Sequence, residues 1–329
     1  MMSDIVLDIN EDEINKLNYD LLAALLVDRT TRKNIIWATS DYEWLGQDYA
    51  ADKEIRIGLI TGSNSKVIQP RILKAQEKKA GRTRERAEVF TPCWVCNEQN
   101  NLVDEQWFGQ ENVFNITDGT MWTATKDKIS FAEKGLKTWK RYVDAKRLEI
   151  TCGEAPYLVS RYDTVTGKTI PIPERIGLLD RKLRVINENT ESEAEWIKWA
   201  RRAVESVYGY EFQGDSLLLA RENILYTFIE YYRNRFEKEP EIKLVNEIAL
   251  VISWNIWQMD GFNYAIPYCK DSTEPYQMTL FDYQLDSDDF MMFDFSSLSD
   301  TKGQALCNIR DWRSKKTVIF KQLVEGEHK

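Results

Sequence analysis

Three acidic residues stand at or just after the ends of predicted β-strands in the centre of the chain: Glu149, Glu211 and Asp260. Glycines follow two of them closely, at Gly153 and Gly261, and a glycine lets the backbone come within contact distance of a ligand. A carboxylate at a strand end accepts hydrogen bonds from both hydroxyls of a ribose, and an acid after the next strand accepts one from an adenine amino group. The spacing therefore predicts a nucleoside-cofactor site, and the alternative is that core packing alone placed these acids.

The elements that would position these acids alternate along the chain. Strand patterns cover 147–151, 207–212 and 255–259, and helical patterns cover 216–235 and 241–253. This alternation predicts an α/β domain with a parallel sheet, and the ligands of such sheets bind at the carboxyl ends of the strands. The glycine pattern of a dinucleotide site is incomplete, because the loop after the first strand lacks a second glycine.

The patterns in the first part of the chain predict a small region of mixed helices and strands that ends near residue 86. A helical pattern covers 19–27, and strand patterns cover 35–38 and 55–60. Further along, Ser192 and Glu195 have the spacing of a capping box, which predicts the start of another helix.

The composition excludes several classes of protein. The 329 residues are 43% hydrophobic and 29% charged, which is typical of a globular protein. No run of about 18 uncharged apolar residues is present, so we expect no membrane span. The acidic start lacks the features of a secretory signal, so we expect a cytoplasmic protein. The only histidine is His328, and Cys93 and Cys96 form a lone C-x-x-C motif, so we expect neither a histidine-dependent catalytic site nor a metal site.

The net charge of −9 is distributed unevenly. Eight lysines and arginines fall between residues 66 and 86, against only Glu77 and Glu85. One interpretation is a solvated helix or loop, and the other is an arm that contacts phosphates on an otherwise acidic protein. The residues that we expect to contact DNA under the second interpretation are Lys74, Lys78, Lys79, Arg82 and Arg84.

Four segments resemble, in order, motifs X, I, II and III of the amino-group (N6-adenine) DNA methyltransferases of restriction–modification systems. They are E-V-F-T-P at 88–92, L-E-I-T-C-G-E-A-P-Y at 148–157, V-Y-G-Y-E at 207–211 with L-A-R-E-N at 219–223, and N-I-W-Q-M-D-G-F at 255–262. Each motif is weak alone, but their order is that of the family, and together they cover just over half of the chain.

The resemblance implies a Rossmann-like core that binds S-adenosylmethionine. This core would span residues 87–270, after the mixed region with its basic connector at 1–86 and before an irregular acidic loop and C-terminal return at 271–329. The residues expected to bind the cofactor are Phe90, Thr91, Glu149, Cys152, Gly153, Glu211, Phe212, Asp260 and Phe262.

The resemblance assigns these residues to parts of the cofactor. Phe90 and Thr91 would flank the methionine end, and Glu149 would line the amino-acid tail with Cys152 and Gly153. Glu211 would accept the ribose hydroxyls. Phe212 and Phe262 would lie on opposite faces of the adenine, and Asp260 would accept from its amino group. The alternatives are plain core aromatics at Phe90 and Phe212 and an ion-paired strand end at Glu149.

The chain departs from the family in its catalytic motif. Adenine methyltransferases carry Asn/Asp-Pro-Pro-Tyr/Phe, and this chain contains no Pro-Pro pair. The nearest remnants, at 266–268 and 274–276, are better explained as turns with a packed tyrosine. Motif I also carries Ala155-Pro156 where a second small residue is usual. If the protein is an enzyme, we expect an adenine-specific DNA methyltransferase that is inactive as a single chain.

The departure leaves several interpretations of the function. In the first, a second protein subunit supplies the catalytic loop and the target-recognition region. In the second, the chain is a catalytically silent methyltransferase-fold binding or regulatory module. A nuclease subunit is a third, with little support, because the E-x-K spacing at 241–243 lacks an upstream Pro-Asp.

The last part of the chain is acidic and aromatic between residues 281 and 300. It is interpreted either as a surface loop or as a segment that binds a partner or mimics DNA. A return through 307–326 is then expected, with a turn at 311–316 followed by the apolar residues 318–320.

Overall fold

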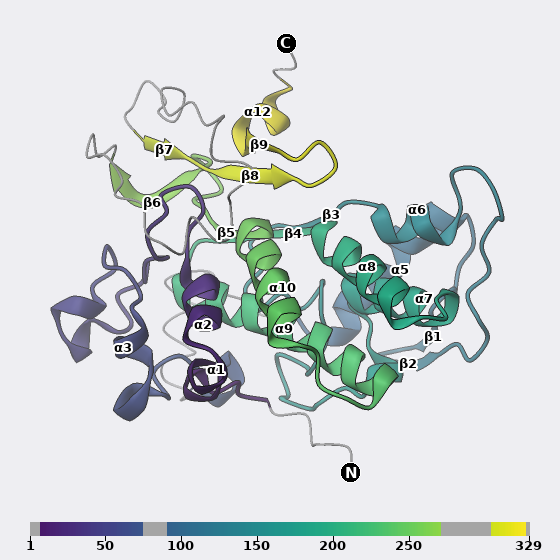
Figure 1. The fold of residues 1–329 in the computed structure, drawn as a ribbon, viewed down its shortest axis with the longest axis horizontal. Coiled ribbons are helices and arrows are strands. Elements are labelled where there is room, and N and C mark those ends of the chain that lie inside the picture. Colours follow the sequence, from purple (N-terminus) through teal and green to yellow (C-terminus); the bar gives the residue numbers. More distant parts are fainter. Residues whose placement is uncertain (1–6, 75–90, 271–303, 327–329) are drawn as a thin grey trace.

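The computed structural model describes residues 7–74, 91–270 and 304–326 (Figure 1). These residues form a mixed α/β structure, which confirms the predicted class at this level. A parallel three-stranded sheet lies at the centre, and the described part also contains three small two-stranded antiparallel sheets.

The central sheet consists of β3 (Arg147–Glu149), β4 (Val207–Glu211) and β5 (Ile256–Gln258), in that spatial order. Both pairs of neighbours are parallel, as the alternation of strands and helices predicts. The first strand is shorter than expected, because Thr151 adopts a positive φ of 46° and turns the chain out of the extended conformation.

Helices cover one face of this sheet (Figure 1). α8 (Glu193–Glu205), α9 (Gly214–Phe236) and α10 (Ile242–Asn255) pack on β4 or β5, and α2 (Tyr19–Leu26) packs on α9 and α10. The predicted capping box is confirmed in part, because the hydroxyl of Ser192 accepts a hydrogen bond from the Glu195 N–H at 3.2 Å and so caps α8.

The opposite side of the sheet is covered by the last described elements of the chain (Figure 1). Phe320 packs there against Trp257 of β5, with ring centroids 5.1 Å apart. The expected turn at 311–316 is confirmed, because Asp311 pairs with Lys316 at the end of a hairpin. The elements on this side are β6 (Ala265–Lys270), β7 (Gln304–Leu306), β8 (Asn308–Asp311), β9 (Lys316–Ile319) and α12 (Phe320–Glu325).

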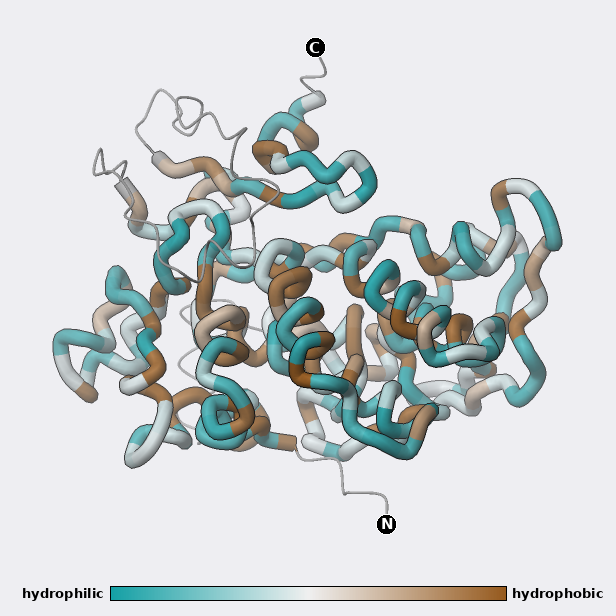
Figure 2. The backbone as a smooth tube through the Cα atoms, in the orientation of Figure 1, coloured by the Kyte–Doolittle hydropathy of each residue, from teal (hydrophilic) through white to brown (hydrophobic). Residues whose placement is uncertain are grey.

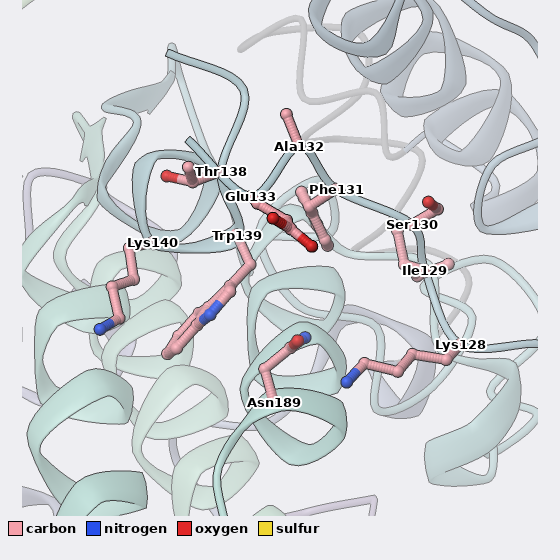
Figure 3. A pocket seen from close by; sticks show the side chains of 10 residues that line it. All are labelled: Lys128, Ile129, Ser130, Phe131, Ala132, Glu133, Thr138, Trp139, Lys140 and Asn189. Carbon is pink, nitrogen blue, oxygen red and sulfur yellow. The ribbon is translucent and has the colours of Figure 1, made fainter. Parts of the chain in front are cut away.

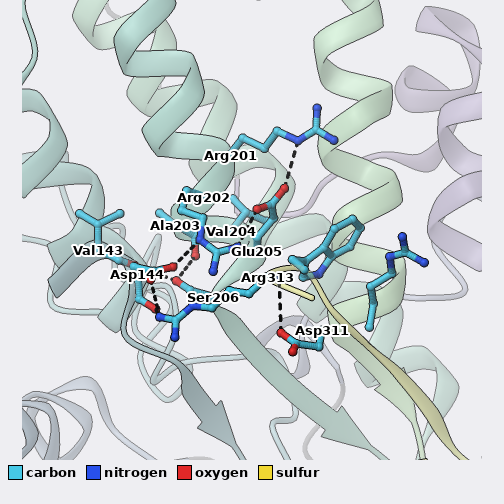
Figure 4. Close-up of polar contacts among 12 residues, drawn as sticks. Val143, Asp144, Arg201, Arg202, Ala203, Val204, Glu205, Ser206, Asp311 and Arg313 are labelled. Atoms are coloured by element: carbon cyan, nitrogen blue, oxygen red, sulfur yellow. Dashed lines mark hydrogen bonds and ion pairs between the residues drawn. The ribbon is translucent and has the colours of Figure 1, made fainter. Parts of the chain in front are cut away.

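A cluster of charged side chains fastens this hairpin to the rest of the molecule (Figure 4). The Asp144 carboxylate, at the end of α6 (Trp139–Asp144), accepts hydrogen bonds from Arg202 and Arg313. Arg313 also donates to the backbone oxygen of Asp144 at 2.9 Å, and Lys146 lies 3.1 Å from Asp311. The hairpin is therefore tied directly to the segment that leads into β3.

The strand predicted over 55–60 is wrong. The chain forms a helix there, α3 (Ile57–Ile60), and the fully buried side chains are Ile55 and Ile60, which do not share a strand face. The segment 35–38 makes only an isolated bridge, between Ile36 and Glu54. Two backbone hydrogen bonds join the segments at 35–37 and 53–55. The Ile55 N–H donates to the Ile35 oxygen at 2.8 Å, and the Trp37 N–H donates to the Lys53 oxygen at 3.0 Å.

Residues 9–68 share a hydrophobic core with the central region, in a continuous cluster that runs from Ile9 to Ile256. Figure 2 shows apolar stretches at the centre, notably in α10, and hydrophilic stretches in the outer loops. The side chain of Gln258 in β5 bonds to both the N–H and the C=O of Ile36, at 2.9 Å each. The boundary expected near residue 86 lies outside the described residues.

The other described elements surround this core. The helices are α1 (Glu11–Leu17), α5 (Cys93–Phe108) and α7 (Leu178–Asn189), and a hairpin is formed by β1 (Asn115–Asp118) and β2 (Met121–Ala124). Short 3₁₀ helices cover Glu43–Leu45, Gln47–Tyr49, Gly62–Asn64, Arg71–Leu73 and Ile172–Glu174. None of the helices in the described ranges has both the length and the apolar character that crossing a membrane requires.

Candidate functional site

The loops after β3 and β4 meet at the carboxyl edge of the central sheet. The Cys152 N–H donates to the Tyr210 oxygen at 2.8 Å, and the Gly153 N–H donates to Glu211 Oε2 at 2.8 Å. The Met259 N–H, just after β5, donates to the Glu211 backbone oxygen at 3.0 Å. The structure therefore brings Cys152, Gly153 and Glu211 together, as the sequence predicts for a ligand site at this edge.

The loop after β3 contains an unusual backbone conformation. Thr151, Gly153 and Ala155 have positive φ values of 46°, 53° and 63°. Two of them carry a Cβ atom, and each such residue costs of the order of 1–3 kcal/mol. The loop is held by the Ala155 N–H, which donates to the Cys152 oxygen at 2.7 Å, and by the side chain of Asn223, which donates to the Glu154 oxygen at 3.1 Å. Strain of this kind is concentrated at ligand sites.

Glu149 lies beneath this loop and is 7% exposed. Its carboxylate accepts backbone hydrogen bonds from Tyr157 at 3.3 Å and from Leu158 at 3.1 Å. Burial raises the pKa of Glu149 to about 8, the two backbone bonds oppose the rise, and the negative charge of Glu211 adds to it. At neutral pH and without a ligand, this carboxyl group is therefore mostly protonated.

Glu211 ends β4 and accepts three backbone hydrogen bonds. They come from Gly153 at 2.8 Å, Phe212 at 2.9 Å and Gln213 at 3.1 Å. Burial nevertheless raises the pKa of its carboxyl group above the ordinary value. In the part of the chain that the structure describes, neither Glu149 nor Glu211 forms an ion pair, so the predicted alternative of an ion-paired strand end at Glu149 finds no partner there. Two desolvated acids side by side favour a cationic ligand.

Thr91 contacts the loop after β3 through Tyr157, although 66 positions separate these two residues. Its side chain hydrogen-bonds to the hydroxyl of Tyr157, which also lies close to Glu149 and Cys96. The backbone oxygen of Thr91 accepts from the hydroxyl of Thr164 at 3.1 Å. The first residue of the predicted pair, Phe90, lies outside the described residues.

The adenine end of the predicted site is more open. Asp260 Oδ1 accepts from the Phe262 N–H at 2.9 Å, and Oδ2 accepts from Asn263 Nδ2 at 2.7 Å. The Phe262 side chain is 96% exposed and makes no wall of a closed pocket. Phe212 is half-buried, and its ring lies 6.2 Å from that of Tyr268 in a T-shaped arrangement.

Tyr268 is a residue that the sequence did not place here. The expected turn at 266–268 is instead part of strand β6, in which Tyr268 has a positive φ of 56° and is 59% exposed. The sequence did not indicate a strand because Pro267 is typical of a turn. In the structure a bulge near the middle of β6 accommodates this proline. The other remnant, at 274–276, lies outside the described residues.

Lys74 is the only described member of the residues expected to contact DNA. Its ammonium lies 3.0 Å from Asp215 Oδ2, and its side chain is 10% exposed. The hydroxyl of Tyr42 donates to the same oxygen at 2.7 Å. In this structure Lys74 is thus engaged within the fold. Lys78, Lys79, Arg82 and Arg84 lie outside the described residues.

The two cysteines of the C-x-x-C motif are buried in the structure. Burial raises the pKa of the Cys93 and Cys96 thiols far above the ordinary value, so both are protonated at neutral pH. Within the described ranges, no group of three or more histidine, cysteine or acidic side chains is arranged to hold a metal ion.

Comparisons with known proteins identified no relative of this chain. No protein-family model matches the chain, and neither the curated proteins nor the solved structures gave a match.

Proposed function

We propose that this chain binds S-adenosylmethionine at the carboxyl edge of the β3–β4–β5 sheet, as the Rossmann-like part of an adenine-specific DNA methyltransferase of a restriction–modification or related system. The observation that carries the proposal is the pair formed by Glu149 and Glu211. They lie at the ends of adjacent parallel strands, Glu149 buried and Glu211 partly buried, with raised pKa values and no cationic partner among the described residues. S-adenosylmethionine brings both a sulfonium and an ammonium group to such a site.

The geometry is compatible with the role proposed for each acid. A carboxylate has about four acceptor sites, so Glu211 can keep its three backbone partners and accept one ribose hydroxyl as well. Asp260 accepts one bond at each oxygen and can accept another from an adenine amino group. Phe212 offers a half-buried ring beside Tyr268 for the adenine face.

Isothermal titration calorimetry with S-adenosylmethionine tests the proposal. Glu211→Ala removes one charge-assisted hydrogen bond to the ribose, worth about 1.5–3 kcal/mol, so the affinity should fall at least about tenfold. Glu98→Ala, which changes an exposed acid on α5, is the matched control and should bind as the wild type does. Equal binding by wild type and Glu211→Ala, or no binding at about millimolar cofactor, would show that the assignment is wrong.

Methyl transfer is proposed to require a second subunit. An adenine amino group is a poor nucleophile and needs acceptors fixed at its two hydrogens, and this chain has no Asn/Asp-Pro-Pro-aromatic motif to supply them. We expect the purified chain to bind the cofactor but not to methylate DNA. Methylation by the single chain that Glu274→Ala abolishes would overturn this and would make the segment at 274–276 catalytic.

The second candidate function is a catalytically silent module that keeps the cofactor site. The same missing motif favours it. The two functions are separated by co-purification: a partner that restores methyl transfer supports the subunit, and cofactor binding without any such partner supports the module.

A further inference from the structure

A surface cavity of about 630 Å³ lies away from the carboxylate site, beside the segment that connects β2 to α6 (Figure 3). It is lined by Lys128–Glu133, by Thr138–Lys140 at the start of α6, and by Asn189 at the end of α7. This volume falls within the range of about 300–1,000 Å³ that is typical of small-ligand sites.

Two aromatic residues, Phe131 and Trp139, line this cavity, and packing holds both in place. Trp139 meets Trp199 of α8 edge to face, with ring centroids 5.0 Å apart. Phe131 lies 6.0 Å from Trp107 and 5.9 Å from Tyr142, in a cluster of rings beneath the cavity. Figure 3 shows Trp139, Glu133, Asn189 and Lys128 around one hollow, so amide and carboxylate groups lie beside the ring that a planar ligand would stack on.

The segment that lines most of this cavity is basic, on a chain of net charge −9. Between residues 126 and 141 there are six lysines and arginines and two acids, Asp127 and Glu133. All six basic side chains are exposed, and the salt bridges found among the described residues include none of them. Lys140 lies 5.4 Å from the Trp139 ring centroid and 5.6 Å from that of Trp199. The basic residues are Lys126, Lys128, Lys134, Lys137, Lys140 and Arg141.

We propose that this cavity receives an unpaired base of a DNA strand, with the surrounding lysines on the flanking phosphates. Aromatic rings that stack on bases, set among cations that follow the backbone, are the usual means of binding single strands. Glu133 and Asn189 would accept from and donate to the edge of the base. A duplex must first unpair and flip a base to use the cavity, which costs about a few kcal/mol, so a single strand should bind more tightly. The inference deepens the proposed function, since it names a second point of contact with DNA, far in sequence from the basic stretch at 66–86.

Fluorescence anisotropy of the full chain tests the inference. The probes are a labelled single strand of about 12 nucleotides, the same sequence as a duplex, and a labelled mononucleotide. The single strand should bind at least about tenfold more tightly than either of the others, because only it combines an open base with several phosphates. Equal binding of the duplex would overturn the inference, and equal binding of the mononucleotide would show a small-molecule site instead.

Two variants separate the base from the phosphates. Trp139→Ala should weaken binding of the single strand about tenfold with little change in its salt dependence. Lys128→Gln combined with Lys140→Gln leaves the aromatic walls in place and should reduce the slope of log affinity against log salt by about 1.4. Lys243→Gln, at an exposed lysine of α10, is the matched control and should change neither quantity.

The outcomes also distinguish this inference from the proposed function. Glu211→Ala should bind the single strand as the wild type does, and Trp139→Ala should keep its calorimetric affinity for S-adenosylmethionine. If Trp139→Ala does not fold, the double lysine variant decides the test. Unchanged affinity and salt slope in the double variant would refute the inference, whatever the cofactor titration shows.

Discussion

Cofactor affinity should depend steeply on pH, because the site must lose a proton to receive a cation. Burial raises the pKa of Glu149 to about 8, so the empty site holds this carboxyl mostly protonated at about pH 7. The ammonium group of S-adenosylmethionine favours the carboxylate, so the pKa of Glu149 should return toward its ordinary value in the complex. Binding is therefore coupled to release of a proton.

The size of this effect follows from the same pKa. For an empty-site pKa of about 8, the affinity should rise about tenfold from about pH 6 to 7 and about fivefold from about pH 7 to 8. It should then level off, because the carboxyl of the empty site is already ionised. One pH unit in the steep range corresponds to about 1.4 kcal/mol of binding free energy.

Calorimetry at about pH 6, 7 and 8, in two buffers of different ionisation enthalpy, measures both the affinity and the protons released. We expect nearly one proton released at about pH 7 in the wild type and far fewer in Glu149→Gln, whose affinity should be weaker and should depend less on pH, through Glu211 alone. A wild-type affinity that stays constant over this range, with no proton released, would refute the reasoning about Glu149. The Glu211→Ala result would then stand alone as evidence on the cofactor.

Three further predictions concern stability. Gly214→Ala should destabilise the fold by at least about 2 kcal/mol in urea unfolding, because its Cβ would lie 2.0 Å from the backbone oxygen of Ile36; Gly58→Ala, in open space on α3, should be neutral or slightly stabilising. Glu222 is fully buried with both carboxylate oxygens unpaired, and burial raises its pKa well above the ordinary value. The unfolded chain therefore releases this proton at a lower pH than the folded chain, and the wild type loses stability as pH rises above about 5. Glu222→Gln should be more stable than the wild type above that pH and show no gain below it. An equal gain at all pH values would contradict the assignment. Asp144→Ala should lower the free energy of unfolding by about 1–2 kcal/mol and speed amide hydrogen exchange in β8 and β9. Unchanged exchange in these strands would show that the cluster does not hold the hairpin.

Periodicity predicted the strands and helices whose burial is decided locally. The strand patterns at 147–151, 207–212 and 255–259 became three adjacent parallel strands, because apolar runs between helices have few other places to be buried. The pattern at 55–60 failed because alternation over six residues does not distinguish a strand from a single helical turn. Its outcome depended on long-range contacts, such as the hydrogen bond from the Ile55 N–H to the Ile35 oxygen, which no local rule contains.

The candidate site was predictable where it rests on strand ends. Glu149, Glu211 and Gly153 came together because parallel strands place their carboxyl ends at one edge of the sheet. Tyr268 was not predictable, because its position depends on an antiparallel pairing with β7 that skips over more than thirty residues of sequence. The aromatic cavity was missed as well, since its lining comes from an irregular connection whose lysines look like ordinary solvated charges in the sequence.

The short helix α6 sets the distance between the cavity and the carboxylate site. Its first turn carries Trp139 at the cavity, and its last residue is Asp144, locked between Arg202 and Arg313. Six helical residues rise about 9 Å, and the few extended residues that lead on to Glu149 add less than about 20 Å. A DNA strand bound in the cavity would lie within about 30 Å of the proposed cofactor site, because α6 connects the two and is fixed at Asp144. α6 would then fix the distance between the two sites, and inserting one residue between Trp139 and the buried Tyr142 should rotate Trp139 by about 100° relative to Tyr142 and weaken binding of the DNA strand at the cavity.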